Sequence, residues 1–170
     1  MKRPNIHSLV GFAYSLVAVI VAVCLTPQQN ALAATATTTF QVTATVLSTC
    51  LVSATPLAFG NYSGAQTDAT STVSVTCTNT TPYNVGLDAG LSTGATVTTR
   101  AMQNGSNTLG YALYSDSART VNWGNTPGTD TVAGTGTGLA QTLTVYGRIP
   151  AGSLPAPGAY ADTITVTVTY

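Results

Sequence analysis

The residues that could do chemistry are few once the first 33 residues are set aside as an export signal. Residues 34–170 contain no histidine, lysine or glutamate. Their charged side chains are Asp68, Asp88, Asp116, Asp130, Asp162, Arg100, Arg119 and Arg148. A serine nucleophile needs a neighbouring base, usually histidine, and glycoside cleavage needs two carboxylates at a fixed separation. The five aspartates are scattered beside turn-forming or strand-terminal sequence, so we expect a protein that is not an enzyme.

Metal ions, cofactors and nucleic acids are also unexpected ligands for this sequence. A transition-metal site would lack histidine, and its sulfur ligands would be committed to a disulfide. A calcium site made of aspartate and carbonyl oxygens stays open, although no EF-hand spacing occurs. A protein that binds a phosphate backbone needs a basic face, whereas three arginines against five aspartates give residues 34–170 a net charge of −2. We therefore expect no cofactor and no nucleic-acid partner.

Two cysteines, Cys50 and Cys77, remain after the export signal. In an oxidising compartment two cysteines allow one intramolecular pairing, so the sequence predicts a disulfide between them. Closing a loop of this length stabilises a fold by about 3 to 4 kcal/mol in the chain-entropy model. Free thiols or a redox site are the alternative, but the C-x-x-C spacing of redox sites is absent.

The N-terminal segment has the organisation of a secretory signal peptide. Lys2 and Arg3 precede a mostly apolar run at 9–25, and Ala31-Leu32-Ala33 is an A-x-A cleavage site. A membrane-spanning helix is the alternative, because the apolar run is nearly long enough. The small-residue site and the threonine-rich continuation favour cleavage after Ala33. We therefore expect residues 1–33 to be a signal peptide, followed by a single domain.

Alternating sequence indicates the strands that must position these side chains. The clearest case is Thr37–Leu47, TTTFQVTATVL, in which one face of an extended strand carries Phe40, Val42, Ala44 and Val46. Threonine and glutamine occupy the other face, which is the period-2 pattern of a half-buried strand. Further extended segments occur at 50–59, 71–79, 83–87, 95–102, 109–115, 141–149 and 162–170. In the last of these, one face carries Ile164, Val166, Val168 and Tyr170.

Turn clusters of glycine, proline, asparagine and aspartate separate these segments. No convincing 3.6-residue period follows the signal, so the sequence predicts an all-β sandwich of immunoglobulin-like character. Pro56 cannot donate to a ladder and predicts an interruption or a sheet edge within segment 50–59. We expect Trp123 to pack in the core or at its rim rather than to stack on a ligand. The glycine-rich run 124–138 is expected to be a surface loop, because no helix pattern follows it that would form a phosphate site.

Several sequence blocks in a fixed order carry a resemblance to a known family. They are Cys50, PLAFGNY (56–62), VSVTCTN (73–79), YNVGLDAG (83–90), LGYALYSDSART (109–120), LTVYGRIPAG (143–152) and PGAYADTITVTVTY (157–170). With these blocks, the chain after the signal resembles the spore coat protein U family from end to end. That family includes pilins of the archaic (Csu-type) chaperone-usher pathway.

The resemblance implies an incomplete immunoglobulin-like sandwich that a donor strand from a neighbouring subunit completes. In such pilins a periplasmic chaperone lends a strand to the groove, and at the outer-membrane usher the N-terminal extension of the next subunit replaces it. Carried onto this sequence, residues 34–48 are the donor extension and residues 49–170 are the pilin domain. The donor residues are then Phe40, Val42, Ala44 and Val46, and the edge of the acceptor groove is formed by Ile164, Val166, Val168 and Tyr170. The resemblance also maps the disulfide to Cys50 and Cys77.

The function implied by the resemblance is that of a structural subunit of an extracellular pilus or fibre. The subunit would be exported through the periplasm, would polymerise head to tail with copies of itself or related pilins, and would support adhesion and biofilm formation. Two alternatives stay open. The stretch 37–47 could fold back as the first strand of its own domain, and the domain could be a self-contained secreted coat or carbohydrate-binding module that uses Trp123 and exposed tyrosines.

Overall fold

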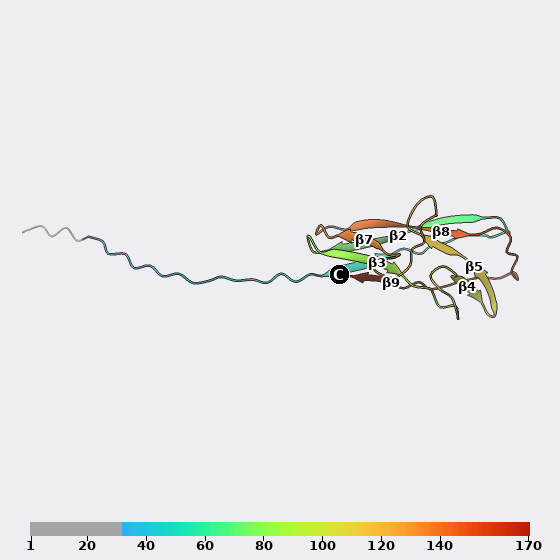
Figure 1. The fold of residues 1–170 in the computed structure, drawn as a ribbon, viewed down its shortest axis with the longest axis horizontal. Helices are drawn as coiled ribbons and strands as arrows, with labels where there is room; N and C mark the ends of the chain where they lie inside the picture. The colour runs from blue at the N-terminus through green and yellow to red at the C-terminus, as the bar shows by residue number, and fades with distance from the viewer. Residues whose placement is uncertain (1–31) are drawn as a thin grey trace, which may run out of the picture. The chain divides into compact units, whose positions relative to one another are not determined.

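The structure is a computed structural model that describes residues 32–170. The expected export signal lies outside the described residues, except for its last two positions. Nine strands and no helix are present in the described range (Figure 1): β1 (Cys50–Ala54), β2 (Thr67–Cys77), β3 (Pro82–Leu87), β4 (Ala101–Asn104), β5 (Asn107–Gly110), β6 (Ala112–Tyr114), β7 (Val132–Thr135), β8 (Gln141–Ile149) and β9 (Val166–Thr169). Residues 32–170 accordingly offer no helix that is long and apolar enough to cross a membrane.

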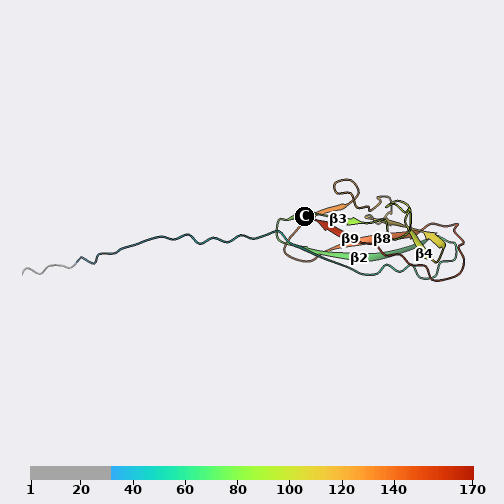
Figure 2. The same cartoon turned by 90° about the horizontal axis from the view of Figure 1, so that it is seen from below.

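The strands form two main sheets and a separate hairpin, and every pairing is antiparallel. The larger sheet has the strand order β1-β2-β8-β6, and the smaller sheet has the order β7-β3-β9. The two sheets lie in separate layers with the core between them (Figure 2). The hairpin β4-β5 turns at Gly105, whose φ of 59° lies in the left-handed region that glycine adopts readily. The all-β sandwich expected from the sequence is confirmed.

The core is built from the alternating faces of the two sheets. In β2 the residues Val73, Val75 and Cys77 point inward and are buried, while the threonines and serines between them face outward. Trp123 is 1% exposed, and its indole Nε1 donates a hydrogen bond of 2.8 Å to the carbonyl oxygen of Val85. Because both the ring and its polar atom are accommodated inside, Trp123 is a core residue, as expected, and is not a ligand platform.

A disulfide joins the beginning of β1 to the end of β2. Cys50 and Cys77 lie directly opposite each other in the antiparallel register and are bonded through their sulfur atoms. The disulfide holds β1 in place at the outer position of the larger sheet. This strand ends at Ala54, two residues before Pro56, which agrees with the interruption predicted for segment 50–59.

Four sequence expectations differ from the structure. The sequence predicts one extended segment at 109–115, but it is divided at Tyr111 between β5 and β6, which belong to different sheets. The sequence predicts a strand at 95–102, but residues 95–100 contain a turn and no strand, and β4 begins only at Ala101. Segment 162–170 was expected to be one strand, but β9 begins only at Val166. The run 124–138 was expected to be a loop, but four of its residues form β7, which pairs with β3. Gly134 permits this pairing, because a side chain there would collide with the ring of Tyr83.

Candidate functional site

A groove lies in the domain formed by residues 43–170. Its volume is about 1210 Å³. Two segments form its walls: Ala54–Gly64, which begins with the last residue of β1, and Ser153–Ile164, which precedes β9. The groove therefore runs where the chain has extended backbone without a complete ladder.

The floor of the groove is the apolar core itself. Both sheets and the β4-β5 hairpin contribute to it, through Val73, Leu87, Met102, Leu109, Leu113, Val145 and Ile149. From the walls, Leu57, Phe59 and Ile164 are half-buried against this floor. The Phe59 ring meets the Tyr111 ring edge-on, with centroids 6.2 Å apart. A ligand that fills the groove must therefore present apolar side chains in order to cover this surface.

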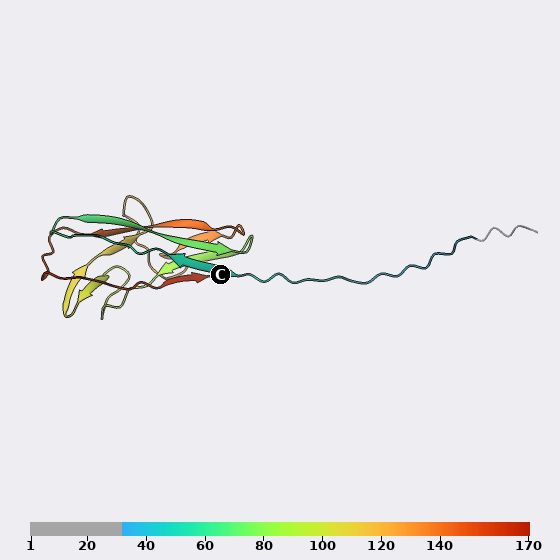
Figure 3. The ribbon, with the colours of Figure 1, turned by 180° about the vertical axis from the view of Figure 1, so that it is seen from behind.

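Edge strands of both sheets meet beside the groove. β1 is the outer strand of the larger sheet and β9 is the outer strand of the smaller sheet. They lie next to one another at one end of the domain, as Figure 3 shows for the two arrows beside the C-terminus. In the described residues β9 has a ladder partner, β3, on one side only. The other side of β9 presents backbone N–H and C=O groups that another strand could pair with.

The far end of the groove is closed by contacts between the wall Ala54–Gly64 and the turn that precedes the other wall. The backbone N–H of Gly152 donates to the carbonyl oxygen of Gly64 at 3.0 Å. The Tyr62 hydroxyl donates to the carbonyl oxygen of Pro150 at 2.8 Å. The groove thus runs from Ala54 and Val166 at one end to Gly64 and Ser153 at the other.

Two aspartates hold the wall that precedes β9 in place, through contacts with Tyr111 and with the loop after β3. Asp162 Oδ2 accepts a hydrogen bond of 2.7 Å from the Tyr111 hydroxyl, and Oδ1 accepts from the backbone N–H of Leu91 at 2.8 Å. Asp88 Oδ1 accepts from the backbone N–H groups of Gly90 and Thr165, at 3.0 and 2.9 Å. The backbone N–H groups of Thr163 and Thr165 thus donate to aspartate side chains. They are not available for a β-ladder, which explains why β9 begins only at Val166.

The environment of these groups shifts two pKa values. Burial raises the pKa of the Tyr111 phenol well above its usual value, and the hydrogen bond to Asp162 raises it further. Burial alone would also raise the pKa of Asp88, but hydrogen bonds from Thr165 and Gly90 and the charge of Arg100 hold it below its usual value. Tyr111 is thus a permanent hydrogen-bond donor at neutral pH, and Asp88 is a permanent acceptor.

A buried arginine, Arg100, stabilises the backbone next to the groove through hydrogen bonds. It is 1% exposed and donates four hydrogen bonds of 2.7 to 2.8 Å to backbone carbonyl oxygens. The acceptors are Leu87, Asp88, Val97 and Trp123. Since Leu87 is part of the floor and Asp88 holds the wall, Arg100 ties the floor, the loop after β3 and the core to one another. Sequence reasoning missed this role, because burial of an arginine leaves no local pattern.

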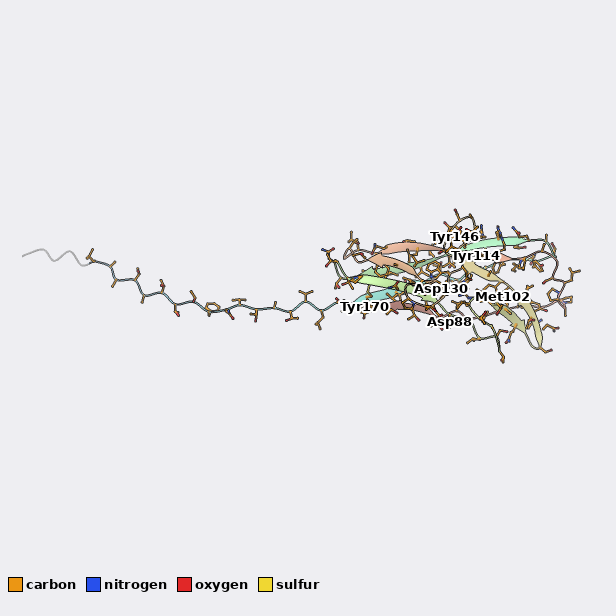
Figure 4. The ribbon with its side chains drawn as sticks, viewed as in Figure 1. Asp88, Met102, Tyr114, Asp130, Tyr146 and Tyr170 are labelled. Atoms are coloured by element: carbon orange, nitrogen blue, oxygen red, sulfur yellow. A yellow bond between two sulfur atoms is a disulfide. The ribbon has the colours of Figure 1, made fainter. Side chains whose placement is uncertain are left out.

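The four residues predicted to form the groove edge differ in whether they line the groove. Ile164 and Val166 line the groove. Val168 packs against the core next to the groove, and Tyr170, labelled in Figure 4, is 58% exposed beyond the end of β9. Sequence reasoning missed the opposite wall, Ala54–Gly64; the signal was Pro56, which marks the point where β1 leaves its ladder.

The predicted donor residues are exposed. Phe40, Val42 and Val46 are 86%, 84% and 87% exposed, and Ala44 is exposed as well. Residues 34–48 contain no strand. Three large apolar side chains therefore lie exposed at alternate or nearby positions of one short segment.

Three further charged residues, Asp68, Arg119 and Arg148, make contacts on the larger sheet. Arg148 binds Asp68 through Nε and Nη2 at 2.8 and 2.9 Å, and the Arg119 guanidinium lies over the ring of Tyr146. Tyr146 pairs with Tyr114 across the larger sheet, and Figure 4 shows both on this layer. Within residues 32–170, no three histidine, cysteine or acidic side chains gather as ligands for a metal ion.

Comparison with known proteins assigns the sequence to a family. The family model described as the Spore Coat Protein U domain matches residues 36–167. The chain is 34% identical over 174 residues to Protein U of Myxococcus xanthus, a match that covers 92% of this chain and 97% of that protein.

A solved structure has the same fold. It is the crystal structure of the CsuC–CsuE chaperone–tip adhesion subunit pre-assembly complex from the archaic chaperone-usher Csu pili of Acinetobacter baumannii. The match has a TM-score of 0.56 and 28% identity, and it covers 74% of this chain but only 40% of the matched chain. The fold is thus one found in chaperone-usher pili, and the present chain belongs to the Spore Coat Protein U family.

Proposed function

We propose that this protein is a structural subunit of an extracellular fibre that is assembled by donor-strand exchange. In this proposal the groove of one subunit accepts residues 37–47 of the next subunit, which is another copy of the chain or a related pilin. A periplasmic chaperone covers the groove before assembly, and an outer-membrane usher is the site of exchange. The fibre then serves adhesion and biofilm formation at the cell surface.

The observation that carries the proposal is the match between the groove and the donor segment. The wall Ala54–Gly64 and the segment Thr37–Leu47 are both eleven residues long. An extended strand of that length spans about 36 Å at ~3.3 Å per residue. One strand could therefore fill the groove from end to end, with its backbone beside the open edge of β9.

The chemistry of the two surfaces is complementary. The groove floor is apolar, and the donor presents Phe40, Val42, Ala44 and Val46 on one face. Burying Phe40, Val42 and Val46 should contribute about 1.5 to 3 kcal/mol each as an upper bound. Backbone pairing would supply affinity, and the alternating side chains would supply specificity, as in other cases of β-augmentation.

The short link between residues 37–47 and β1 favours a groove that is filled by the segment of another subunit and not by the chain's own segment. The segment joins its own domain at Thr49, directly before β1, which lies beside β9. If the segment ran antiparallel to β9 with Thr37 beside Thr169, Leu47 would lie near Tyr160. Tyr160 is about 20 Å along the wall from Val166, the nearest residue of β9, at ~3.3 Å per residue. Residues 48–49 can span only about 10 Å, so the chain's own segment cannot enter in this direction. A head-to-tail contact that does not close on itself propagates as a fibre.

A fused donor strand tests the proposal. A copy of residues 37–47 is attached after Tyr170 through a turn of four residues, so that it can run back beside β9. We expect a soluble monomer that folds without the chaperone and does not polymerise. The matched control carries the same fusion with Phe40, Val42 and Val46 of the added copy changed to serine. Equal folding of both fusions would overturn the proposal, because it would show that the groove does not need the donor's apolar face.

A further inference from the structure

Along residues 160–168, the side chains that face the groove and the core are apolar at every position except one. Residues at even positions from 160 to 168 are half-buried, whereas the residues between them are exposed. The inward series is Tyr160, Asp162, Ile164, Val166 and Val168. Four of these residues pack against the core. Asp162 is the exception, and it lines the groove with a carboxylate.

The carboxylate of Asp162 is held in a fixed position. Tyr111, Leu91 and Thr163 donate to it at 2.7, 2.8 and 2.8 Å. Gly90 lies so close that a side chain at this position would collide with the carboxylate. A strand that enters the groove therefore passes a negative charge that is already hydrogen-bonded and has little freedom to move away.

The apolar face of the proposed donor segment also has one position that differs from the others, because its side chain is small. This face carries Phe40, Val42, Ala44 and Val46, and Ala44 is the one small side chain among them. Covering a carboxylate with a bulky apolar group removes its remaining water and costs free energy. Alanine covers it with the least apolar surface and leaves room for a water molecule beside the carboxylate.

We propose that Asp162 sets the register of the donor strand, and this inference rests on the proposed function. The donor of the next subunit runs antiparallel to β9 with Ala44 opposite Asp162. Val42 then lies opposite Ile164, Phe40 opposite Val166, and Val46 opposite Tyr160. A shift of two residues in either direction would place Val42 or Val46 over the carboxylate. Asp162 is thus a specificity-determining residue that selects a donor with a small side chain at this position.

Cysteine pairs on the solvent-facing side test the register without changing the apolar contacts. In the proposed register Thr43 of one copy lies opposite Thr163 of the other. The chain is produced with Thr43→Cys and Thr163→Cys, and the assembled fibre is oxidised. The matched controls pair Thr43→Cys with Ala161→Cys or with Thr165→Cys, which a two-residue shift would bring together. Such a shift moves the cysteines by about 7 Å, beyond the reach of a disulfide.

We expect covalent multimers on a non-reducing gel with the 43/163 pair and a loss of these multimers with both control pairs. Multimers with a control pair, or with none of the three pairs, would overturn the register and leave the proposed function intact. Absence of any fibre from the chain without added cysteines would overturn the proposed function instead.

Substitution of Ala44 gives a second readout. Ala44→Leu should lower the amount of fibre about tenfold or more, since it places a bulky side chain against Asp162. Ala44→Ser keeps the side chain small and should assemble normally, as should Thr43→Leu on the solvent-facing side. Normal assembly of Ala44→Leu would contradict the role of Asp162.

Discussion

The Tyr111 hydroxyl donates a hydrogen bond of 2.7 Å to Oδ2 of Asp162, and this bond joins the floor of the groove to its wall. Tyr111 belongs to the core between β5 and β6, whereas Asp162 lies on the segment before β9. Their contact spans 51 residues of sequence. Together with the contacts of Asp88, it holds the wall in place without a complete ladder.

The first prediction is that Tyr111→Phe loosens this wall. The substitution removes a hydrogen bond to a charged group, which is typically worth about 1.5 to 3 kcal/mol. We expect the free energy of unfolding of the donor-fused chain to fall by about this amount in a urea titration. The control is Tyr170→Phe, because the Tyr170 side chain is exposed and should leave the stability unchanged. Equal stability of both variants would show that the Tyr111–Asp162 bond contributes nothing.

The second prediction concerns the buried Arg100. Arg100→Met keeps much of the aliphatic volume but leaves four carbonyl oxygens without their donor. Each unsatisfied buried acceptor costs about 1 to 3 kcal/mol, so we expect the domain to lose most of its stability and to be degraded after export. The measurement is the amount of protease-resistant protein in the periplasm.

Arg148→Met is the matched control for Arg100. Arg148 is also an arginine on the domain, but its ion pair with Asp68 lies at the surface, where such pairs contribute little. The Arg148 variant should accumulate normally. Wild-type amounts of the Arg100 variant would contradict the supporting role that we assign to that residue.

Much of the fold could be predicted from sequence because it depends on local alternation. The residues Val73, Val75 and Cys77 repeat every second position, and they form the inward face of β2. The pairing of Cys50 with Cys77 could be predicted because only two cysteines remain after the expected export signal, which leads to an oxidising compartment. Trp123 could be assigned to the core because an indole buries a large apolar surface.

The groove could be predicted only in part, because it arises where pairing is absent. Residues 162–165 continue the alternating pattern of β9, yet Asp88 and Asp162 bond the backbone N–H groups of this stretch and of Leu91. Such bonds connect residues 71 and 77 positions apart, and no local pattern reports them. The same holds for Arg100, whose four acceptors come from three separate parts of the chain.

The third prediction is a loss of stability in acid that depends on Asp88. Its pKa in the folded protein lies below the ordinary value of 3.8. The unfolded state therefore binds the proton first as the pH falls, so the contribution of Asp88 is complete above pH 3.8 and is lost as the pH falls through its folded pKa. We expect Asp88→Asn to lower stability at neutral pH and to flatten the dependence of the free energy of unfolding on pH below 3.8. An unchanged pH dependence would contradict the role of Asp88 in holding Thr165.

The fourth prediction separates folding from assembly. Residues 34–47 belong to none of the nine strands and do not line the groove, so a chain that lacks them should still form the domain. We expect it to accumulate in the periplasm bound to the chaperone and to accept the donor of another subunit. It should not extend onto a preceding subunit, because it has no donor of its own. The measurement is the length of fibres when the truncated and full-length chains are produced together, and fibres of the truncated chain alone would contradict the donor assignment.

The last prediction concerns Phe40, the largest side chain on the donor's apolar face. Phe40→Ala removes most of the apolar surface that this residue would bury in the groove, so each junction should lose about 1.5 to 3 kcal/mol as an upper bound. We expect fibres of this variant to dissociate in detergent at a lower temperature than wild-type fibres. Gln41→Ala changes the adjacent solvent-facing side chain and should leave the dissociation temperature unchanged. If the two variants behaved in the opposite way, the strand would enter with its threonine and glutamine face inward, since a shift of one residue exchanges the two faces.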